Sequence, residues 1–123
     1  MATADVLDEH GDNAVLRERV SEPGDGRVLV VDAGGSLRRA LIGDMVAGAA
    51  HDKGWAGIVV WGCVRDVAAL RELPLGIKAL GSNPRPSSKA GAGEVDVPVT
   101  FRGVNYRPGA MLYSDDDGIA VIE

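Results

Sequence analysis

The chain has 123 residues, 46% of them hydrophobic, which is enough for one domain with a buried core. Its formal net charge is −5, and no basic stripe with interleaved aromatic residues is present, so direct nucleic-acid binding is disfavoured. The single cysteine, Cys63, excludes an internal disulfide and suits the reducing cytoplasm, and no apolar stretch approaches the ~20 residues of a membrane span. We therefore expect one cytoplasmic domain over residues 1–123, without membrane contact.

The N-terminal part of the chain is predicted to contain two helices followed by a strand. Thr3–Glu9 begins with a potential N-cap and carries apolar residues on one face, which predicts a short helix. Asn13–Val20 shows the same spacing and predicts a second helix. Arg27–Asp32 is too short for a helix and rich in valine, as expected of a strand that is buried on both faces.

A turn and a longer helix are expected next. Gly34 and Gly35 follow the strand directly, which favours a hairpin turn with Leu37–Ile42 as the return strand. The glycines match neither a dinucleotide-binding loop nor a Walker loop, so a phosphate cradle is disfavoured here. Asp44–Lys53 has apolar residues at helical spacing and ends before Gly54, which predicts a helix.

The middle of the chain alternates between strand and helix patterns. Gly57–Trp61 reads as a buried strand, a short helix begins at Asp66 and is closed by Pro74, and Gly76–Leu80 resumes as a strand. This alternation is typical of an α/β layer. Gly81–Gly93 is rich in glycine, proline and serine and is predicted to be a long surface loop.

The C-terminal part is predicted to consist of strands only. An acidic turn is expected at Ser114–Gly118 between the last two of them. The expected strands are Val95–Phe101, with Pro98 on an edge, Val104–Tyr106, Ala110–Tyr113 and Ile119–Ile122. An α/β fold with a mixed central sheet follows from the whole pattern.

Two neighbouring residues after the Gly57–Trp61 strand suggest a site for an anionic substrate and a metal. Asp66 lies where a strand gives way to a helix, which is the usual ligand position in open α/β sheets, although a plain N-cap is the alternative. Arg65 next to it has the planar fork that holds a substrate carboxylate through two hydrogen bonds. A cation on Asp66 would then take the keto oxygen of the same substrate.

The helix start at Gly43-Asp44-Met45-Val46 offers a third element of this site. Free backbone N–H groups at a helix start attract an anion, and Gly43 would let that anion approach closely. The alternative for Asp44 is a first-turn carboxylate that only stabilises the helix.

Other polar residues are weaker candidates. His10 and His51 lack the spacing of a zinc pair, and Cys63 is expected to pack as a small apolar residue. Asp115–Asp117 lacks the alternating ligands and distal glutamate of an EF-hand, so a solvated turn is expected.

With these residues in hand, the chain resembles the family of the regulator of ribonuclease E activity A (RraA-like), which includes 4-hydroxy-4-methyl-2-oxoglutarate aldolases. The matching stretches run in family order from Arg27 to the C-terminus and include LIGDMVAGAA and GCVRDVAALREL. The resemblance implies a swivelling β/β/α fold with a mixed central sheet, assembled as a homotrimer with active sites at subunit contacts. A strand-bearing segment of the family is absent where Gly11-Asp12-Asn13 joins the acidic head to the following helix, so we expect an N-terminally shortened domain.

The resemblance also assigns roles within the site. It places the substrate arginine on Arg65 and the metal-binding carboxylate on Asp66, with Mg²⁺ or Mn²⁺ as the cofactor. The substrate loop falls on Gly43, Asp44, Met45 and Val46. Arg65 and the backbone amides of the loop would hold the substrate carboxylate, and Asp44 would orient a water that shuttles a proton. Arg65 and Asp44 are thus the expected catalytic residues.

The implied activity is aldol cleavage of 4-hydroxy-4-methyl-2-oxoglutarate to pyruvate. Oxaloacetate decarboxylation is expected as a secondary activity, because it passes through the same pyruvate enolate. The alternative is a non-catalytic protein-interaction module that binds ribonuclease E or an RNA helicase, for which the acidic balance suits a basic partner.

Overall fold

The computed structural model describes residues 2–8, 14–33, 40–82, 94–95, 99–101, 104–114 and 119–122. The helices in these ranges are α1 (Ala14–Val20), α2 (Asp44–Asp52) and α3 (Val67–Arg71). The strands are β1 (Ala2–Asp8), β2 (Val28–Asp32), β3 (Ala40–Ile42), β4 (Gly57–Val64), β5 (Gly76–Ser82), β6 (Glu94–Val95), β7 (Val99–Phe101), β8 (Val104–Tyr106), β9 (Met111–Ser114) and β10 (Ile119–Ile122).

The described strands form one mixed sheet of eight strands and a separate pair. At the centre of the sheet, β1, β2, β4 and β5 are neighbours in that order and run parallel, and β3 also pairs with β4 in parallel. β6 and β9 join β1 in antiparallel fashion, and β10 follows β9. β7 and β8 form the antiparallel pair.

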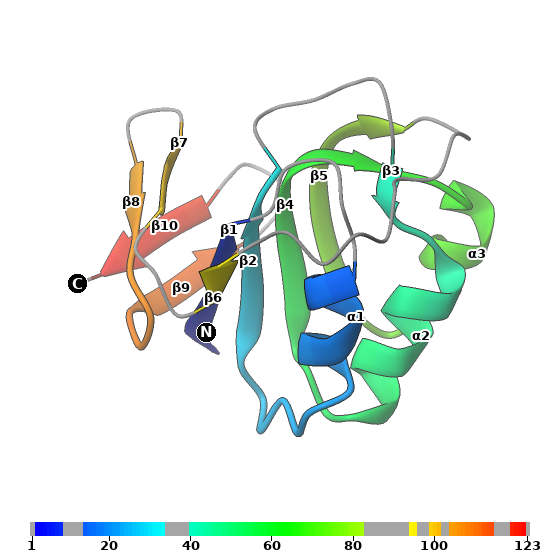
Figure 1. Cartoon of the computed structure of the whole chain (residues 1–123), viewed down its shortest axis with the longest axis horizontal. Coiled ribbons are helices and arrows are strands. Elements are labelled where there is room, and N and C mark those ends of the chain that lie inside the picture. Colours follow the sequence, from blue (N-terminus) through cyan, green and yellow to red (C-terminus); the bar gives the residue numbers. More distant parts are fainter. Residues whose placement is uncertain are drawn as a thin grey trace.

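Helices and antiparallel strands cover opposite faces of the parallel strands (Figure 1). On β2, Leu29 and Val31 belong to the core beneath the helices, whereas Val28 and Val30 belong to a second core with residues of β7, β8 and β9. All four side chains are buried, which confirms the prediction of a strand buried on both faces. The expected α/β fold, a β/β/α layering with a mixed central sheet, is also confirmed.

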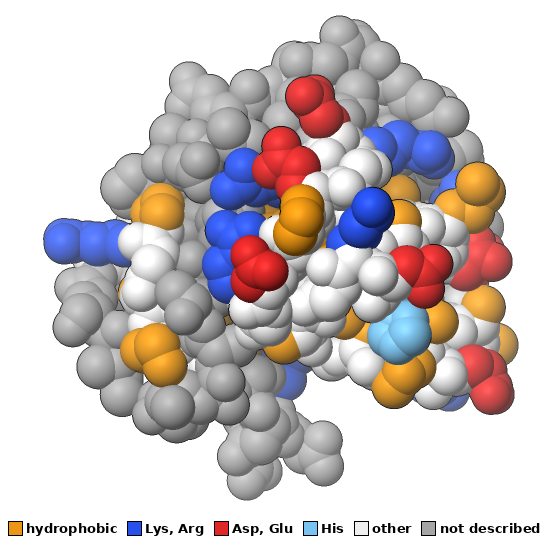
Figure 2. Space-filling view, turned by 90° about the horizontal axis from the view of Figure 1, so that it is seen from below, with side chains coloured by type: hydrophobic (Ala, Val, Ile, Leu, Met, Phe, Trp, Pro, Cys, Tyr) orange, Lys and Arg blue, Asp and Glu red, His pale blue; other side chains and the backbone are white. Residues whose placement is uncertain are grey.

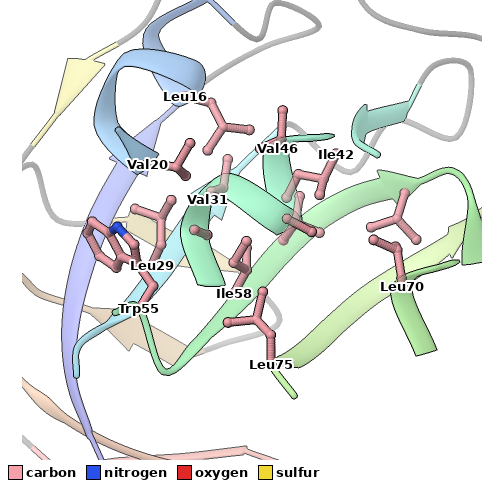
Figure 3. Packing of buried hydrophobic residues seen from close by; sticks show 14 of the residues in the cluster. Leu16, Val20, Leu29, Val31, Ile42, Val46, Trp55, Ile58, Leu70 and Leu75 are labelled. Atoms are coloured by element: carbon pink, nitrogen blue, oxygen red, sulfur yellow. The ribbon is translucent and has the colours of Figure 1, made fainter. Parts of the chain in front are cut away.

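The helix-side core holds the turns that matter for the site (Figure 3). Ile42 at the end of β3 and Val46 in the first turn of α2 are 0% and 4% exposed. Val64 at the end of β4 and Leu70 in α3 are each 7% exposed. Each of the two turns is therefore anchored by a buried side chain before and after it.

The predicted helix over Thr3–Glu9 is wrong, because Ala2–Asp8 forms the strand β1. Its residues pair in parallel with β2 from Ala4 opposite Val28 to Asp8 opposite Asp32. Local helical spacing is a weak signal, and the hydrogen bonds offered by the edge of β2 override it. The predicted helix before β2 is confirmed as α1.

The predicted hairpin between Arg27–Asp32 and Leu37–Ile42 is also wrong. β3 pairs in parallel with β4, where Ala40 lies opposite Cys63. Every residue of β2 already pairs with β1 on one edge and with β4 on the other, so β2 has no edge left for a return strand. Gly34 and Gly35 themselves lie outside the described residues.

The remaining predictions are mostly confirmed with adjusted ends. α2, α3, β5, β8, β9 and β10 lie where helices and strands were predicted, and β4 extends to Val64. The single strand expected over Val95–Phe101 is described as two separate strands, β6 and β7, with different partners. His10, most of the Gly81–Gly93 loop and the acidic residues 115–117 lie outside the described residues. No helix in the described ranges has the length and apolar character needed to cross a membrane.

Candidate functional site

The site is built where two turns meet at the carboxyl ends of β3 and β4. Because these strands are parallel neighbours, the turn from β3 into α2 and the turn from β4 into α3 emerge at the same edge. A backbone hydrogen bond of 2.8 Å from the Arg65 N–H to the Ile42 carbonyl ties one turn to the other. The structure thereby brings Gly43 and Asp44 next to Arg65 and Asp66, although the two pairs lie more than twenty residues apart in sequence.

Asp66 takes an unusual backbone conformation and turns its carboxylate towards the neighbouring helix. Its φ and ψ are 57° and 42°, in the left-handed region that Asp enters more readily than most residues. Asp66 occupies the N-cap position of α3, as the alternative interpretation held, and its carbonyl accepts a hydrogen bond of 2.9 Å from the Leu70 N–H, but its side chain makes no capping hydrogen bond to that helix. Instead, the Asp66 Oδ2 accepts a hydrogen bond of 3.1 Å from the backbone N–H of Asp44.

Arg65 and Asp66 form a loose ion pair at the surface. The Arg65 Nη1 lies 3.9 Å from the Asp66 Oδ2, which is longer than a hydrogen bond. The two side chains are 31% and 36% exposed, so a small solute reaches both. Because this contact is not a bidentate, hydrogen-bonded ion pair, the Arg65 guanidinium can turn to bind a substrate carboxylate.

The start of α2 supplies backbone donors beside this pair. The first helical hydrogen bond runs from the Ala47 N–H to the Gly43 carbonyl, so the preceding N–H groups lie outside the helical ladder. The N–H of Asp44 donates to the Asp66 carboxylate, so this donor is already occupied by an anionic group of the protein itself. The amides of Met45 and Val46 remain as the donors expected for a substrate.

The side chains of this first turn point to different surroundings. Val46 is buried in the core and can offer only its backbone, whereas the Met45 side chain is 70% exposed. Asp44 is also exposed, and its carboxylate stands at the positive end of the helix dipole.

A divalent cation fits the donors of this site only if other ligands complete its shell. Asp66 supplies a solvent-accessible carboxylate, and hard cations prefer oxygen. Among the described residues, no group of three His, Cys, Asp or Glu side chains could hold a metal. Mg²⁺ commonly uses one or two protein carboxylates and completes its six positions with water and substrate oxygens, so the residues fit such a cation.

The weaker candidates lie apart from the site or are shielded. His51 is exposed near the end of α2, with its Nδ1 3.4 Å from the Asp52 Oδ1. Cys63 is buried in β4, as expected, and burial raises the pKa of its thiol, which keeps it protonated.

A hollow that the sequence did not reveal adjoins the site. It measures about 460 Å³ and lies between α3 and β5, with Val64, Val67, Leu70 and Arg71 among its walls. Val64 and Val67 flank Arg65 and Asp66 directly. Only the apolar spacing along α3 hinted at it, and that spacing equally fits a helix packed against the sheet.

The structure is thus a β/β/α domain in which the candidate site lies at the carboxyl ends of the parallel strands β3 and β4. The family described as Aldolase/RraA (RraA-like) matches residues 2–121, so the chain belongs to the RraA-like family. This finding confirms the resemblance seen in the sequence.

Individual relatives carry different names. The chain is 56% identical over 112 residues to a protein of Ectopseudomonas mendocina (strain ymp) named "Putative 4-hydroxy-4-methyl-2-oxoglutarate aldolase", covering 91% of this chain and 69% of that one. It is 48% identical to a structure described as the RNA-processing inhibitor RraA from Thermus thermophilis, with a TM-score of 0.97, covering 98% of this chain and 74% of that one. A structure described as S-adenosylmethionine:2-dimethylmenaquinone methyltransferase from Geobacillus kaustophilus HTA426 is 42% identical, with a TM-score of 0.95 and the same coverage.

Proposed function

We propose that the protein cleaves 4-hydroxy-4-methyl-2-oxoglutarate to pyruvate in a reaction that depends on Mg²⁺ or Mn²⁺. The observation that carries this proposal is the arrangement of Arg65 and Asp66 against the first turn of α2, with the Asp66 carboxylate 3.1 Å from the Asp44 N–H. The name of the Ectopseudomonas mendocina relative supports the same substrate.

Different residues of the site bind different groups of the substrate. Arg65 and the amides of Met45 and Val46 bind the carboxylate next to the keto group, since a guanidinium fork and a helix start both favour a planar anion. Asp66 is the protein ligand of the cation. When bound, the cation supplies Lewis-acid polarisation of the 2-keto oxygen.

Asp44 is positioned to take part in proton transfer. Its exposed carboxylate projects from the same turn whose backbone meets Asp66. We assign it the orientation of a water that takes the proton of the 4-hydroxyl group and returns a proton to carbon 3. Oxaloacetate loses its distal carboxylate by breaking the equivalent carbon–carbon bond, so the same residues would serve decarboxylation as a secondary activity.

We further propose that residues 1–123 act as one domain, shortened near its N-terminus, and assemble as a homotrimer in the cytoplasm. Arg65 and Asp66 are each about a third exposed in the single chain, so a neighbouring subunit could close the site. Light scattering on the purified protein would give the mass of the assembly and test the trimer directly.

The activity is tested by following pyruvate formation with a coupled dehydrogenase, with and without Mg²⁺. Asp66→Asn is the informative variant, because asparagine also tolerates the left-handed backbone but lacks the charge that binds a cation. Asp52→Asn is the matched control, since this carboxylate is 80% exposed in the last turn of α2. We expect Asp66→Asn to lose at least about a hundredfold in kcat/KM, as removal of a transition-state interaction does, and Asp52→Asn to match the parent. No metal-dependent activity in the parent, or full activity in Asp66→Asn, would reject the proposal.

The second candidate is a regulator that binds ribonuclease E or an RNA helicase without catalysis. It is favoured by the description of the Thermus relative as an RNA-processing inhibitor and by the net charge of −5. On the face shown in Figure 2, acidic and basic side chains are interleaved, which suits a protein partner better than a nucleic-acid backbone. Binding to the basic scaffold region of the endonuclease that weakens with salt and is unchanged in Asp66→Asn, with no lyase activity, would favour this candidate.

A further inference from the structure

The backbone conformation of Gly43 does not by itself require a glycine. Its φ and ψ are −120° and −168°, an extended conformation that any residue adopts. It is nevertheless buried, between Ile42 in the core and the exposed Asp44. The reason for a glycine here must therefore lie in what a side chain would meet.

A methyl group on Gly43 would collide with both residues of the ion pair. An ideal Cβ at this position would stand 2.7 Å from the Asp66 Oδ2, 2.9 Å from the Arg65 Nε and 3.1 Å from the Arg65 Cγ. The first two distances are under 3.0 Å, and real Cβ atoms essentially never come that close to a non-bonded heavy atom. Two side chains from the other turn therefore lie directly against the bare Cα of Gly43.

Moving either neighbour aside would change how its charged group is presented. Asp66 has a short side chain, and its Oδ2 is held by the Asp44 N–H at 3.1 Å. The backbone of Arg65 is held by the Ile42 carbonyl at 2.8 Å, and the atoms in the way belong to the middle of its side chain. Shifting them would turn the whole guanidinium.

We propose that Gly43 is a positioning residue, whose missing side chain lets the Arg65 stem and the Asp66 carboxylate rest on the first turn of α2. In this role it sets where the guanidinium and the metal-binding carboxylate are presented, and it contacts neither substrate nor cation through a side chain. The catalytic consequence rests on the proposed function, whereas the steric contact itself does not.

The test compares Gly43→Ala with Gly48→Ala. Gly48 lies within α2, and a Cβ there would meet nothing within 4 Å, so alanine should be neutral or stabilising. Mn²⁺ binding by paramagnetic resonance, thermal unfolding and pyruvate formation are measured on each. We expect Gly43→Ala to weaken Mn²⁺ binding by about tenfold or more, as displaced supporting contacts do at metal sites, and to lower the unfolding midpoint. Gly48→Ala should change neither.

A double variant makes the steric argument falsifiable even if the protein binds no metal. Arg65→Ala removes the Cγ and Nε that the new methyl would meet, so adding Gly43→Ala in that background should lower the unfolding midpoint less than it does in the parent. If Gly43→Ala alone does not fold, combining it with both Arg65→Ala and Asp66→Gly, which removes the three atoms nearest to the new methyl, should recover folding. An equal loss in both backgrounds, or no recovery, overturns the positioning role. Absence of Mn²⁺ binding in the parent would count against the proposed function and leave this coupling as the test of Gly43.

Discussion

Replacing Asp66 by alanine and by glycine separates the contribution of its backbone from that of its carboxylate. Its φ of 57° is left-handed, and alanine there costs about 1–2 kcal/mol because its Cβ approaches the following carbonyl. Glycine avoids that cost but loses roughly 0.5–1 kcal/mol through greater freedom in the unfolded chain. Both variants lose the hydrogen bond from the Asp44 N–H, worth about 1 kcal/mol.

The difference between the two variants is therefore set by the backbone alone. We expect Asp66→Gly to be more stable than Asp66→Ala by about 0.5–1 kcal/mol, and Asp66→Ala to be less stable than the parent. Urea unfolding followed by circular dichroism measures this as the shift of the midpoint at constant slope. Equal midpoints, or a more stable alanine variant, would refute the assigned backbone conformation. Both variants should lose metal-dependent activity, whatever their stability.

Three further predictions concern single side chains. Arg65→Lys should lower kcat/KM in the pyruvate assay by at least about tenfold, since a point charge cannot hold a carboxylate through two parallel hydrogen bonds. Trp55→Phe should lower the urea-derived stability by about 1 kcal/mol, because the buried indole Nε1 donates to the Glu22 carbonyl at 3.1 Å. Burial raises the pKa of the Cys63 thiol and of the Tyr106 hydroxyl above their values in the unfolded chain. The folded chain therefore holds these two protons more tightly than the unfolded chain does. The stability that depends on the protonated thiol and phenol is present below their ordinary pKa values of about 8.5 and 10 and is lost above them, so the urea midpoint should fall as the pH rises through that range.

Local patterns predicted the parts of the fold whose physical cause is local. The unbroken apolar run of β2 required cover on both faces, and the helical spacing of α2 required one buried side. The same patterns failed for β1, where Ala2–Asp8 fits a short helix as well as a strand. The choice between them depends on a free edge of β2, which is a property of the assembled sheet.

The candidate site shows the same division. Its residue types could be chosen from the sequence, because a glycine–aspartate helix start and an arginine–aspartate pair after a strand each suggest a chemistry. The sequence could suggest that these residues lie close together but could not establish it, because their proximity depends on β3 pairing in parallel with β4 and not in a hairpin with β2.

The sequence by itself determined which strands are apolar enough to be buried and which charged residue types follow them. Only the tertiary structure decided that the Asp66 carboxylate turns away from its own helix to the Asp44 N–H, and that Gly43 must lack a side chain for this to happen. The physical reason is that burial and helix formation follow from neighbours along the chain, whereas steric contact between two turns depends on which strands share an edge.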